Sequence, residues 1–269
     1  MRLAPRAGGA ALVTGASSGI GEAFARSLAS RGFDLVLAAR SGDRLAALAS
    51  ELSARHGIAA EPVVVDLAAE GGAEELFAKA EGSGREIGVL VNNAGFGLNG
   101  AEAELPLPRV LDVVRLNVLS LVELTHRHLV AMRARRRGAI LNVASTQAFL
   151  PDPYMAAYGA SKAFVLSFTE ALHVEAEDYG VTVTCLCPGY TRTRFYEVSG
   201  MRGPSGTPFP EMRAEDVAEI GLHALERGRA VVVPHPLDRL WIFGGRLVPR
   251  AFPRRIAARL FRRRVNPAG

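Results

Sequence analysis

The sequence predicts an α/β fold in which helices cover both faces of a doubly wound parallel sheet of about seven strands. Three observations support this prediction. Short apolar segments alternate six times with helical patterns. The first apolar segment runs directly into a glycine-rich turn and then a helical pattern. Polar residues follow several apolar segments, at the strand ends where folds of this class bind ligands.

The first expected strand spans residues 10–14, and the first helix spans residues 22–31. Glycines in the turn between them allow a tight bend and let backbone N–H groups at a helix N-terminus approach a pyrophosphate. The strand before this turn and the helix after it favour dinucleotide binding. We therefore expect cofactor contacts at Gly15, Ser17, Ser18, Gly19, Ile20 and Gly21.

The second expected strand, residues 34–39, ends at Arg40. In dinucleotide folds an acid at this strand end accepts a hydrogen bond from the ribose 2′-OH of NAD, whereas a base accommodates the 2′-phosphate of NADP. The acid is missing here, and Ser41 and Arg44 follow Arg40. This pattern predicts NADP(H) in preference to NAD(H). The alternative is that Arg40 is simply a solvated residue at a strand end.

A helix expected at residues 43–56 leads to a third strand, residues 61–65, which is closed by Asp66 and Leu67. The Asp66 carboxylate at this tip can accept a hydrogen bond from an adenine amino group. The alternative, almost as strong, is that Asp66 caps the helix expected from about Ala69.

The fourth strand, residues 89–91, runs into a loop that carries two side-chain amides and a glycine. In this loop we expect Asn93, Ala94 and Gly95 to contact both the cofactor and neighbouring backbone. A long helix expected at residues 108–135 then carries Asn117 among apolar residues. Because a buried amide is costly unless bonded, Asn117 should either support a neighbouring backbone segment or hold a water molecule.

The fifth strand, residues 139–143, delivers Ser145 to its tip. The helix that follows begins with Tyr158 and Lys162, which are four residues apart and share one face. An ammonium beside a phenol favours the phenolate, so we expect Lys162 to lower the pKa of Tyr158. Tyr158 is then a candidate general acid or base, and Ser145 a candidate partner of the substrate oxygen. The alternative is an ordinary surface pair on a helix.

Amino-acid usage favours the catalytic interpretation of this pair. Of the 32 Lys and Arg residues, only Lys79 and Lys162 are lysines. An ammonium is a compact charge with rotatable donors, whereas a guanidinium is a planar fork. Lys162 therefore marks a position at which arginine would not serve.

The sixth strand, residues 181–187, gives way to a polar segment that can contact the nicotinamide and the phosphates. We expect these contacts from Pro188, Gly189, Thr191 and Thr193. Residues 195–212 combine Gly and Pro clusters with apolar side chains, which predicts a mobile substrate lid. A helix at residues 214–227 and a seventh strand at residues 230–233 complete the sheet.

Taken together, these motifs resemble the short-chain dehydrogenase/reductase family in its single-domain form. The resemblance covers about residues 8–235 and implies a Rossmann-type fold. It also implies that Tyr158 protonates a carbonyl oxygen held by Ser145, and that Lys162 lowers the pKa of Tyr158 and binds the nicotinamide ribose. Asn117 would hold a relay water, and the long helices would build a homodimer or homotetramer. The matching residues are Thr14-Gly15-x3-Gly19-Ile20-Gly21, Asp66, Asn92-Asn93-Ala94-Gly95, Asn117, Ser145, Tyr158, Lys162, and Pro188-Gly189 with Thr193.

The expected activity is NADPH-dependent reduction of a ketone or aldehyde, with Tyr158 as proton donor, or the reverse oxidation. An apolar substrate such as a 3-oxoacyl thioester or a ketosteroid suits the apolar lid. The alternative is a dinucleotide-binding scaffold or sensor without useful turnover. The complete set of Asn117, Ser145, Tyr158 and Lys162 weighs against that alternative.

Residues 1–236 are expected to form one catalytic domain, and residues 237–269 a basic amphipathic helical extension. The extension carries nine Arg and one Asp, a net charge of +8, so the rest of the chain carries −3 of the total of +5. Arginines interleaved with apolar residues predict a helix on an anionic membrane surface. The alternative is a pair of short helices that pack on the lid or a neighbouring subunit. No nucleic-acid-binding motif accompanies the charge, so nucleic acid is not an expected partner.

The remaining composition narrows the class of protein. The six histidines show no metal-ligand spacing, so no metal is expected. Cys185 and Cys187 lie within an apolar strand and are expected to be core thiols in a reducing compartment. Neither a signal peptide nor a run of 18 apolar residues is present. The expected localisation is cytoplasmic, with peripheral membrane contact through the extension as a further expectation.

Overall fold

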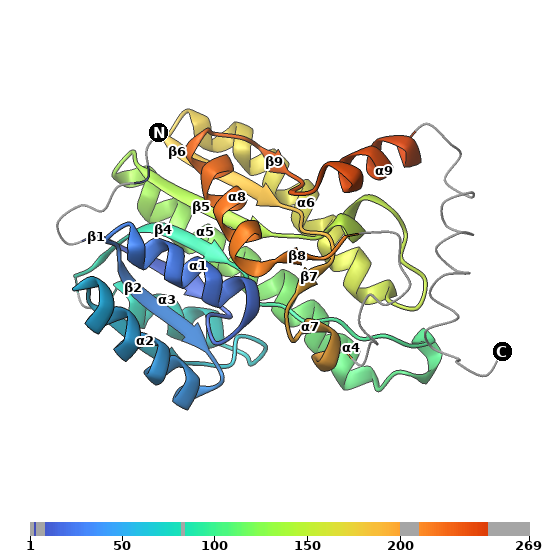
Figure 1. Cartoon of the computed structure of the whole chain (residues 1–269), viewed down its shortest axis with the longest axis horizontal. Coiled ribbons are helices and arrows are strands. Elements are labelled where there is room, and N and C mark those ends of the chain that lie inside the picture. Colours follow the sequence, from blue (N-terminus) through green and yellow to red (C-terminus); the bar gives the residue numbers. More distant parts are fainter. Residues whose placement is uncertain (1–2, 4–8, 82–83, 200–209, 247–269) are drawn as a thin grey trace.

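The computed structural model describes residues 3, 9–81, 84–199 and 210–246. Its centre is a seven-stranded parallel sheet with the strand order β3-β2-β1-β4-β5-β6-β9, shown in Figure 1. This sheet confirms the predicted fold class. Its strands are β1 (Gly9–Thr14), β2 (Asp34–Ala39), β3 (Ala60–Val64), β4 (Glu86–Asn92), β5 (Gly138–Val143), β6 (Val181–Leu186) and β9 (Val231–Val232).

Helices cover both faces of the sheet because its central strands are apolar on both sides. Successive side chains of a strand point to opposite faces. Leu12 and Val36 accordingly pack into one core, and Val13 and Leu37 into the other. The core of Val13 includes α1 (Gly19–Ser30), α2 (Gly42–His56) and α8 (Ala214–Glu226), and that of Leu12 includes α3 (Gly72–Glu81), α5 (Leu121–Ala134) and α6 (Ala156–Glu177).

The strand order reverses at β1, which pairs with β2 on one side and with β4 on the other. In a doubly wound sheet, the connections that leave the two strands at such a reversal run in opposite directions. They leave a crevice at the carboxyl ends of these strands. The glycine-rich turn after β1 and the loop after β4 therefore meet at one place.

Three helices differ from their predicted bounds by three residues or more, and one of them, α1, begins at Gly19 instead of residue 22. The helix expected at residues 108–135 contains a π-helical segment, Arg115–Ser120, between α4 (Leu107–Val114) and α5. Asn117 lies in this segment, and π turns often occur at functional sites. The apolar pattern of the sequence did not reveal the π-helical segment, because α4, this segment and α5 follow one another without a break.

The helix expected from about Ala69 begins three residues later, at Gly72. A side chain at Gly72 would have its Cβ 2.2 Å from the Asp66 carbonyl oxygen. The chain after β3 therefore makes a tight turn before α3 starts, and Gly71 takes a positive φ of 74° within it. The start of this helix was therefore predicted three residues too early.

Two short elements lie at the carboxyl end of the sheet, α7 (Phe195–Val198) and α9 (Pro236–Arg246), as Figure 1 shows. The strand β7 (Thr191–Arg192) precedes α7 and pairs with β8 (Met212–Arg213). α9 packs against the 3-10 turn Thr146–Phe149, and its residue Ile242 is buried. The described start of the predicted extension thus lies on the catalytic domain. Within the described ranges, no helix combines the length and hydropathy that a membrane span requires.

The predicted lid and the rest of the extension fall partly outside the described residues. Residues 200–209 of the lid and residues 247–269 of the extension belong to this part. The two cysteines are free and buried, with their Sγ atoms 3.7 Å apart. Both therefore pack as core thiols, as expected.

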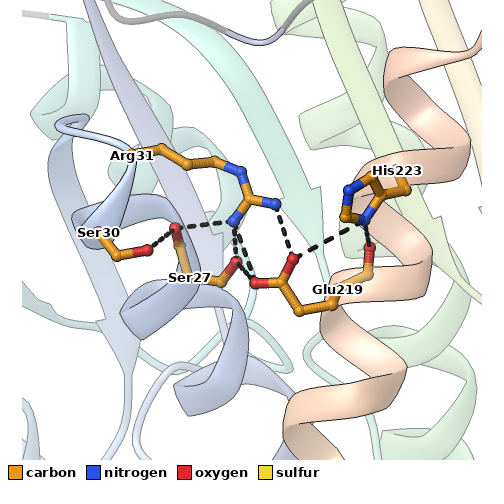
Figure 2. Close-up of polar contacts among 5 residues, drawn as sticks. All are labelled: Ser27, Ser30, Arg31, Glu219 and His223. Atoms are coloured by element: carbon orange, nitrogen blue, oxygen red, sulfur yellow. Dashed lines mark hydrogen bonds and ion pairs between the residues drawn. The ribbon is translucent and has the colours of Figure 1, made fainter.

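A polar cluster joins α1 to α8 and holds these two helices on the same face of the sheet (Figure 2). Arg31 donates from Nη2 to Glu219 Oε2 over 2.7 Å, and Ser27 Oγ donates to Glu219 Oε1 over 2.5 Å. His223 Nδ1 lies 3.8 Å from the same carboxylate. The Arg31 guanidinium, with help from Ser27, lowers the pKa of Glu219 to about 2.

Glu219→Gln is expected to destabilise the protein at neutral pH by about 1 kcal/mol or less, because solvent screens a pair that is partly exposed. The pKa of Glu219 is lower in the folded state than the usual value of about 4.3. The stabilisation is therefore complete above about pH 5 and is lost as the pH falls toward about 2. Urea unfolding of both proteins along this pH range measures the difference. Glu70→Gln, an exposed carboxylate outside the cluster, is the control, and a difference independent of pH would contradict the prediction.

Candidate active site

The glycine-rich turn can be built only with glycines at its critical positions. Gly15 and Gly19 take positive φ angles of 67° and 60°, which side chains disfavour. A Cβ at Gly21 would lie 2.2 Å from the Gly15 carbonyl oxygen and 2.5 Å from Asn93 Nδ2. The N-terminus of α1 therefore approaches the sheet closely and leaves backbone N–H groups facing the crevice.

Thr14 and Asn93 join the tips of β1 and β4. Thr14 Oγ1 accepts hydrogen bonds from the backbone N–H groups of Asn93 and Ala94, each over 3.0 Å. Asn93 Nδ2 donates to the Thr14 carbonyl oxygen, also over 3.0 Å. The Asn93 side chain thus supports the glycine-rich turn, and a direct contact with a cofactor stays a prediction.

The turn and the tip of β2 together form a cavity of about 710 Å³. The structure brings the predicted residues Ser17, Ser18, Arg40 and Arg44 together around it. Hydroxyl and guanidinium donors suit a phosphate group, so these residues fit the adenosine end of an NADP molecule. The remaining lining residues are Ser41, Gly42, Asp43 and Arg194, of which Arg194 was not predicted.

Asp66 and Leu67 follow β3 but do not line this cavity. Asp66 is exposed, and its Oδ1 accepts a hydrogen bond from the backbone N–H of Ala68 over 2.9 Å. The carboxylate therefore stabilises the local turn, close to the capping role that was the alternative. Leu67 is buried, and its carbonyl accepts a hydrogen bond from Ser120 Oγ. Contacts of both residues with an adenine stay predictions.

The predicted catalytic residues meet between the tip of β5 and the first turns of α6. Ser145 caps a 3-10 turn by accepting from the backbone N–H of Gln147, and its hydroxyl lies close enough to Tyr158 to act against the rise of the Tyr158 pKa. Lys162 Nζ donates to the Val143 carbonyl oxygen over 2.8 Å and lies 5.8 Å from the centre of the Tyr158 ring. Ser145, Tyr158 and Lys162 are all buried. The strand and the helix thus place two hydroxyls and an amine in one small region.

Asn117 supports this region from the π-helical segment. Its Oδ1 accepts from the Phe96 N–H over 3.1 Å, and its Nδ2 donates to the Phe96 carbonyl and to Ser161 Oγ, both over 3.0 Å. Ser161 in turn donates to the Tyr158 carbonyl. Of its two predicted roles, Asn117 therefore fills the first through these bonds, which is to support a neighbouring backbone segment. The relay water stays a prediction.

The loop after β4 fits closely against the same residues. A Cβ at Gly95 would lie 3.0 Å from Asn117 Oδ1 and 3.3 Å from Lys162 Nζ. Only a glycine lets the backbone pass between these two side chains without displacing them. Gly95, predicted as a cofactor contact, therefore also sets the spacing of the catalytic residues.

The expected lowering of the Tyr158 pKa is wrong in this structure. Burial raises the pKa of Tyr158, the hydrogen bond with Ser145 opposes the rise, and the nearby Asp152 adds to it. Burial also lowers the pKa of Lys162, to about 8. Loss of solvation disfavours the charged form of each group and is the largest contribution to each pKa shift. Tyr158 is therefore a protonated phenol at neutral pH, as a proton donor must be.

The segment after β6 lies against both halves of the site. The Pro188 carbonyl accepts from the Thr146 N–H, and Thr191 Oγ1 donates to the Gly189 carbonyl over 3.1 Å. A Cβ at Gly19 would lie 2.9 Å from Thr193 Cγ2. Of the predicted contact residues, Thr193 thus meets the glycine-rich turn, and Pro188 meets the turn that Ser145 caps.

Sequence reasoning missed several neighbours of the catalytic residues. The Phe195 ring centre lies 5.3 Å from that of Tyr158, and a Cβ at Gly97 would meet the Met155 and Tyr158 side chains. Asp238 of α9 would lie 2.2 Å from a Cβ at Gly189, and burial raises its pKa. The sequence did offer a signal for Phe195, because it is an apolar residue of the predicted lid. Asp238 had none, because only the fold brings α9 to this place. Among the described residues, no cluster could hold a metal ion.

Comparisons with known proteins place this geometry in context. The family model described as short chain dehydrogenase matches residues 9–200. The very-long-chain 3-oxoacyl-CoA reductase of Anas platyrhynchos is 33% identical over 247 residues, which are 90% of this chain and 77% of that protein. The Bos taurus protein of the same name is 36% identical over 205 residues, and the match spans 64% of its length.

Solved structures agree with this similarity. A short-chain dehydrogenase from Sphingobium yanoikuyae in complex with NADPH has a TM-score of 0.79 and 32% identity, covering 88% of this chain and 92% of that one. A structure from a study of 7β-hydroxysteroid dehydrogenase stereoselectivity has a TM-score of 0.83 and 26% identity, covering 92% and 95%. The arrangement of the sheet and helices is therefore shared with these structures.

Gly21→Ala is expected to weaken dinucleotide binding by about 10-fold or more, because the new Cβ overlaps the Gly15 carbonyl and the Asn93 amide. Calorimetric titration with NADPH measures the affinity. Gly244→Ala is the matched control, since a Cβ there meets nothing within 4 Å. Equal affinities for wild type and Gly21→Ala would contradict the prediction.

Proposed function

This chain belongs to the short-chain dehydrogenase/reductase family, whose members are NAD(P)-dependent oxidoreductases acting on CH–OH and C=O groups, and on this premise we propose that it is an NADPH-dependent reductase of apolar 3-oxoacyl thioesters. The observation that carries the proposal is the buried cluster of Ser145, Tyr158 and Lys162 beside the dinucleotide crevice. The same residues serve the reverse oxidation of an alcohol.

Each residue of the cluster has a role that follows from its environment. Tyr158 is a protonated phenol because burial raises its pKa, so it can donate a proton to a carbonyl oxygen. The Ser145 hydroxyl lies close enough to Tyr158 to affect its pKa, so it can hold the same oxygen. NADPH, when bound, supplies the hydride. Lys162, with a pKa of about 8, carries its charge at neutral pH and stabilises the phenolate that remains after the transfer.

Charge around the adenosine end of the crevice supports NADP(H) over NAD(H). Arg40 and Arg44 line the cavity beside Ser17 and Ser18. No acid stands at the tip of β2, where it would accept from a ribose 2′-OH and repel a 2′-phosphate. We therefore assign the 2′-phosphate to Arg40.

The proposed substrate class rests on the relatives and on the apolar groups near Tyr158. Two relatives with 33% and 36% identity carry the name very-long-chain 3-oxoacyl-CoA reductase. The side chains of Met155 and Phe195 pack around Tyr158 as one small apolar cluster. Such an apolar surface suits an acyl chain beside the reacting carbonyl.

A homodimer or homotetramer stays part of the proposal. α4, α5 and α6 expose large apolar side chains to solvent in the single chain. Leu111 is 42% exposed, Val130 56%, Phe164 43% and Val174 68%. Burial of these residues against a second copy would remove apolar surface from water.

Peripheral membrane contact also stays a prediction. α9 exposes Leu237, Leu240 and Trp241, which lie on one side of the helix at i, i+3 and i+4. Residues 247–269, which lie outside the described part, carry seven arginines and no acid. Apolar side chains next to positive charge are the combination that binds anionic lipid surfaces.

Tyr158→Phe is expected to lower kcat/KM for ketone reduction by about 10² to 10⁴-fold, because it removes the proton donor and keeps the ring packing. NADPH affinity should change little. NADPH and NADH oxidation is followed with 3-oxoacyl thioesters of rising chain length and with a ketosteroid. Tyr179→Phe, at the far end of α6 under the Arg133 guanidinium, is the control. Unchanged turnover by Tyr158→Phe would overturn the proposed function.

Leu240→Asp combined with Trp241→Asp is expected to reduce binding to vesicles that contain anionic phospholipid, because it removes the exposed apolar side of α9. Co-sedimentation measures bound and free protein. Neutral vesicles and the variant Val174→Asp, on the exposed side of α6, serve as controls. Equal sedimentation of wild type and variant would remove membrane contact through α9 from the proposal.

A further inference from the structure

A third arginine, Arg194, lines the cavity that also contains Arg40 and Arg44. It comes from the segment after β7, far along the chain from the other lining residues. Three guanidinium groups and a single carboxylate, that of Asp43, border the cavity. The formal charge of its lining is therefore +2, which matches a dianionic ligand.

The backbone of Arg194 is held from both sides by described residues. On one side, Thr193 packs on the glycine-rich turn, where its Cγ2 atom leaves no room for a Cβ at Gly19. On the other side, the Phe195 ring packs on Tyr158, with ring centres 5.3 Å apart. The Phe195 N–H also donates to Thr193 Oγ1 over 3.2 Å. The backbone of Arg194 is thus held in place between the glycine-rich turn and Tyr158.

The Arg194 guanidinium retains donors for a ligand. Its Nε lies 3.2 Å from Glu197 Oε2, and the two side chains are 53% and 71% exposed. Such an exposed pair is weak, and it leaves both Nη groups free of this contact. Arg40 and Arg44 form no ion pair with any carboxylate of the described residues. The positive charge of the cavity is therefore available to a phosphate.

We infer that Arg194 binds the 2′-phosphate of NADP(H) together with Arg40 and Arg44, and so helps determine cofactor specificity. This inference rests on the proposed function, which assigns NADP(H) to the crevice. The competing target for Arg194 is the pyrophosphate, which belongs to the N-terminus of α1. NADH and NADPH share the pyrophosphate, whereas only NADPH carries the 2′-phosphate. The two targets therefore predict different results with the two cofactors.

The test is calorimetric titration of the full chain with NADPH and, separately, with NADH. Arg194→Ala is expected to weaken NADPH binding by about 10-fold, the effect of losing one charge-assisted contact. NADH affinity should stay within about twofold of wild type, which also verifies that the variant is folded. Arg192→Ala is the matched control, because Arg192 is 74% exposed, pairs with Glu211 and does not line the cavity. Arg40→Ala gives the reference loss for an arginine at the predicted phosphate site.

The outcomes separate this inference from the proposed function. A wild type that binds NADPH and NADH equally would overturn the proposed cofactor, and the inference with it. A wild-type preference for NADPH that is lost in Arg40→Ala but kept in Arg194→Ala would overturn the inference alone. An equal loss for both cofactors in Arg194→Ala would also overturn it, because it would place Arg194 on the pyrophosphate.

Discussion

The Thr14 hydroxyl is the contact on which the site depends. It accepts from two successive N–H groups of the loop after β4 and donates to the Val91 carbonyl. One side chain therefore ties the tip of β1 to the tip of β4 at the point where the strand order reverses. Because both tips are fixed, the glycine-rich turn and the loop with Gly95 can approach without side chains between them. The crevice is a result of that close approach.

From this junction a continuous set of contacts reaches the catalytic residues. Gly95 passes between Asn117 and Lys162, and Asn117 is bonded to the backbone of Phe96 and to Ser161. Ser161 is bonded to the Tyr158 carbonyl. A buried amide with all these partners is rigid, since any displacement would leave a polar group unpaired. The dinucleotide side and the reacting side of the site are thereby held at a constant distance.

Burial is the largest contribution to the pKa shifts of both Tyr158 and Lys162. Exclusion of water raises the pKa of Tyr158 and lowers that of Lys162 to about 8, so Tyr158 keeps its proton and Lys162 still carries its charge at neutral pH. A phenol that keeps its proton until a carbonyl oxygen arrives is suited to reduction. The segments after β6 contribute to this exclusion, since Phe195 covers Tyr158 and α9 places Asp238 on Gly189. Helices outside the sheet thus influence groups that the sheet positions.

The sequence by itself determined the seven strands, most helices and several of the residues that meet at the crevice. Local periodicity and glycine spacing depend only on neighbours along the chain, so Gly15, Ser145, Tyr158 and Lys162 could be selected without a structure. Only the tertiary structure decided the π turn at Asn117, the direction of the Tyr158 pKa shift and the presence of Arg194 in the cavity with Arg40 and Arg44. These properties arise from burial and from contacts between residues distant in sequence, which no local pattern records.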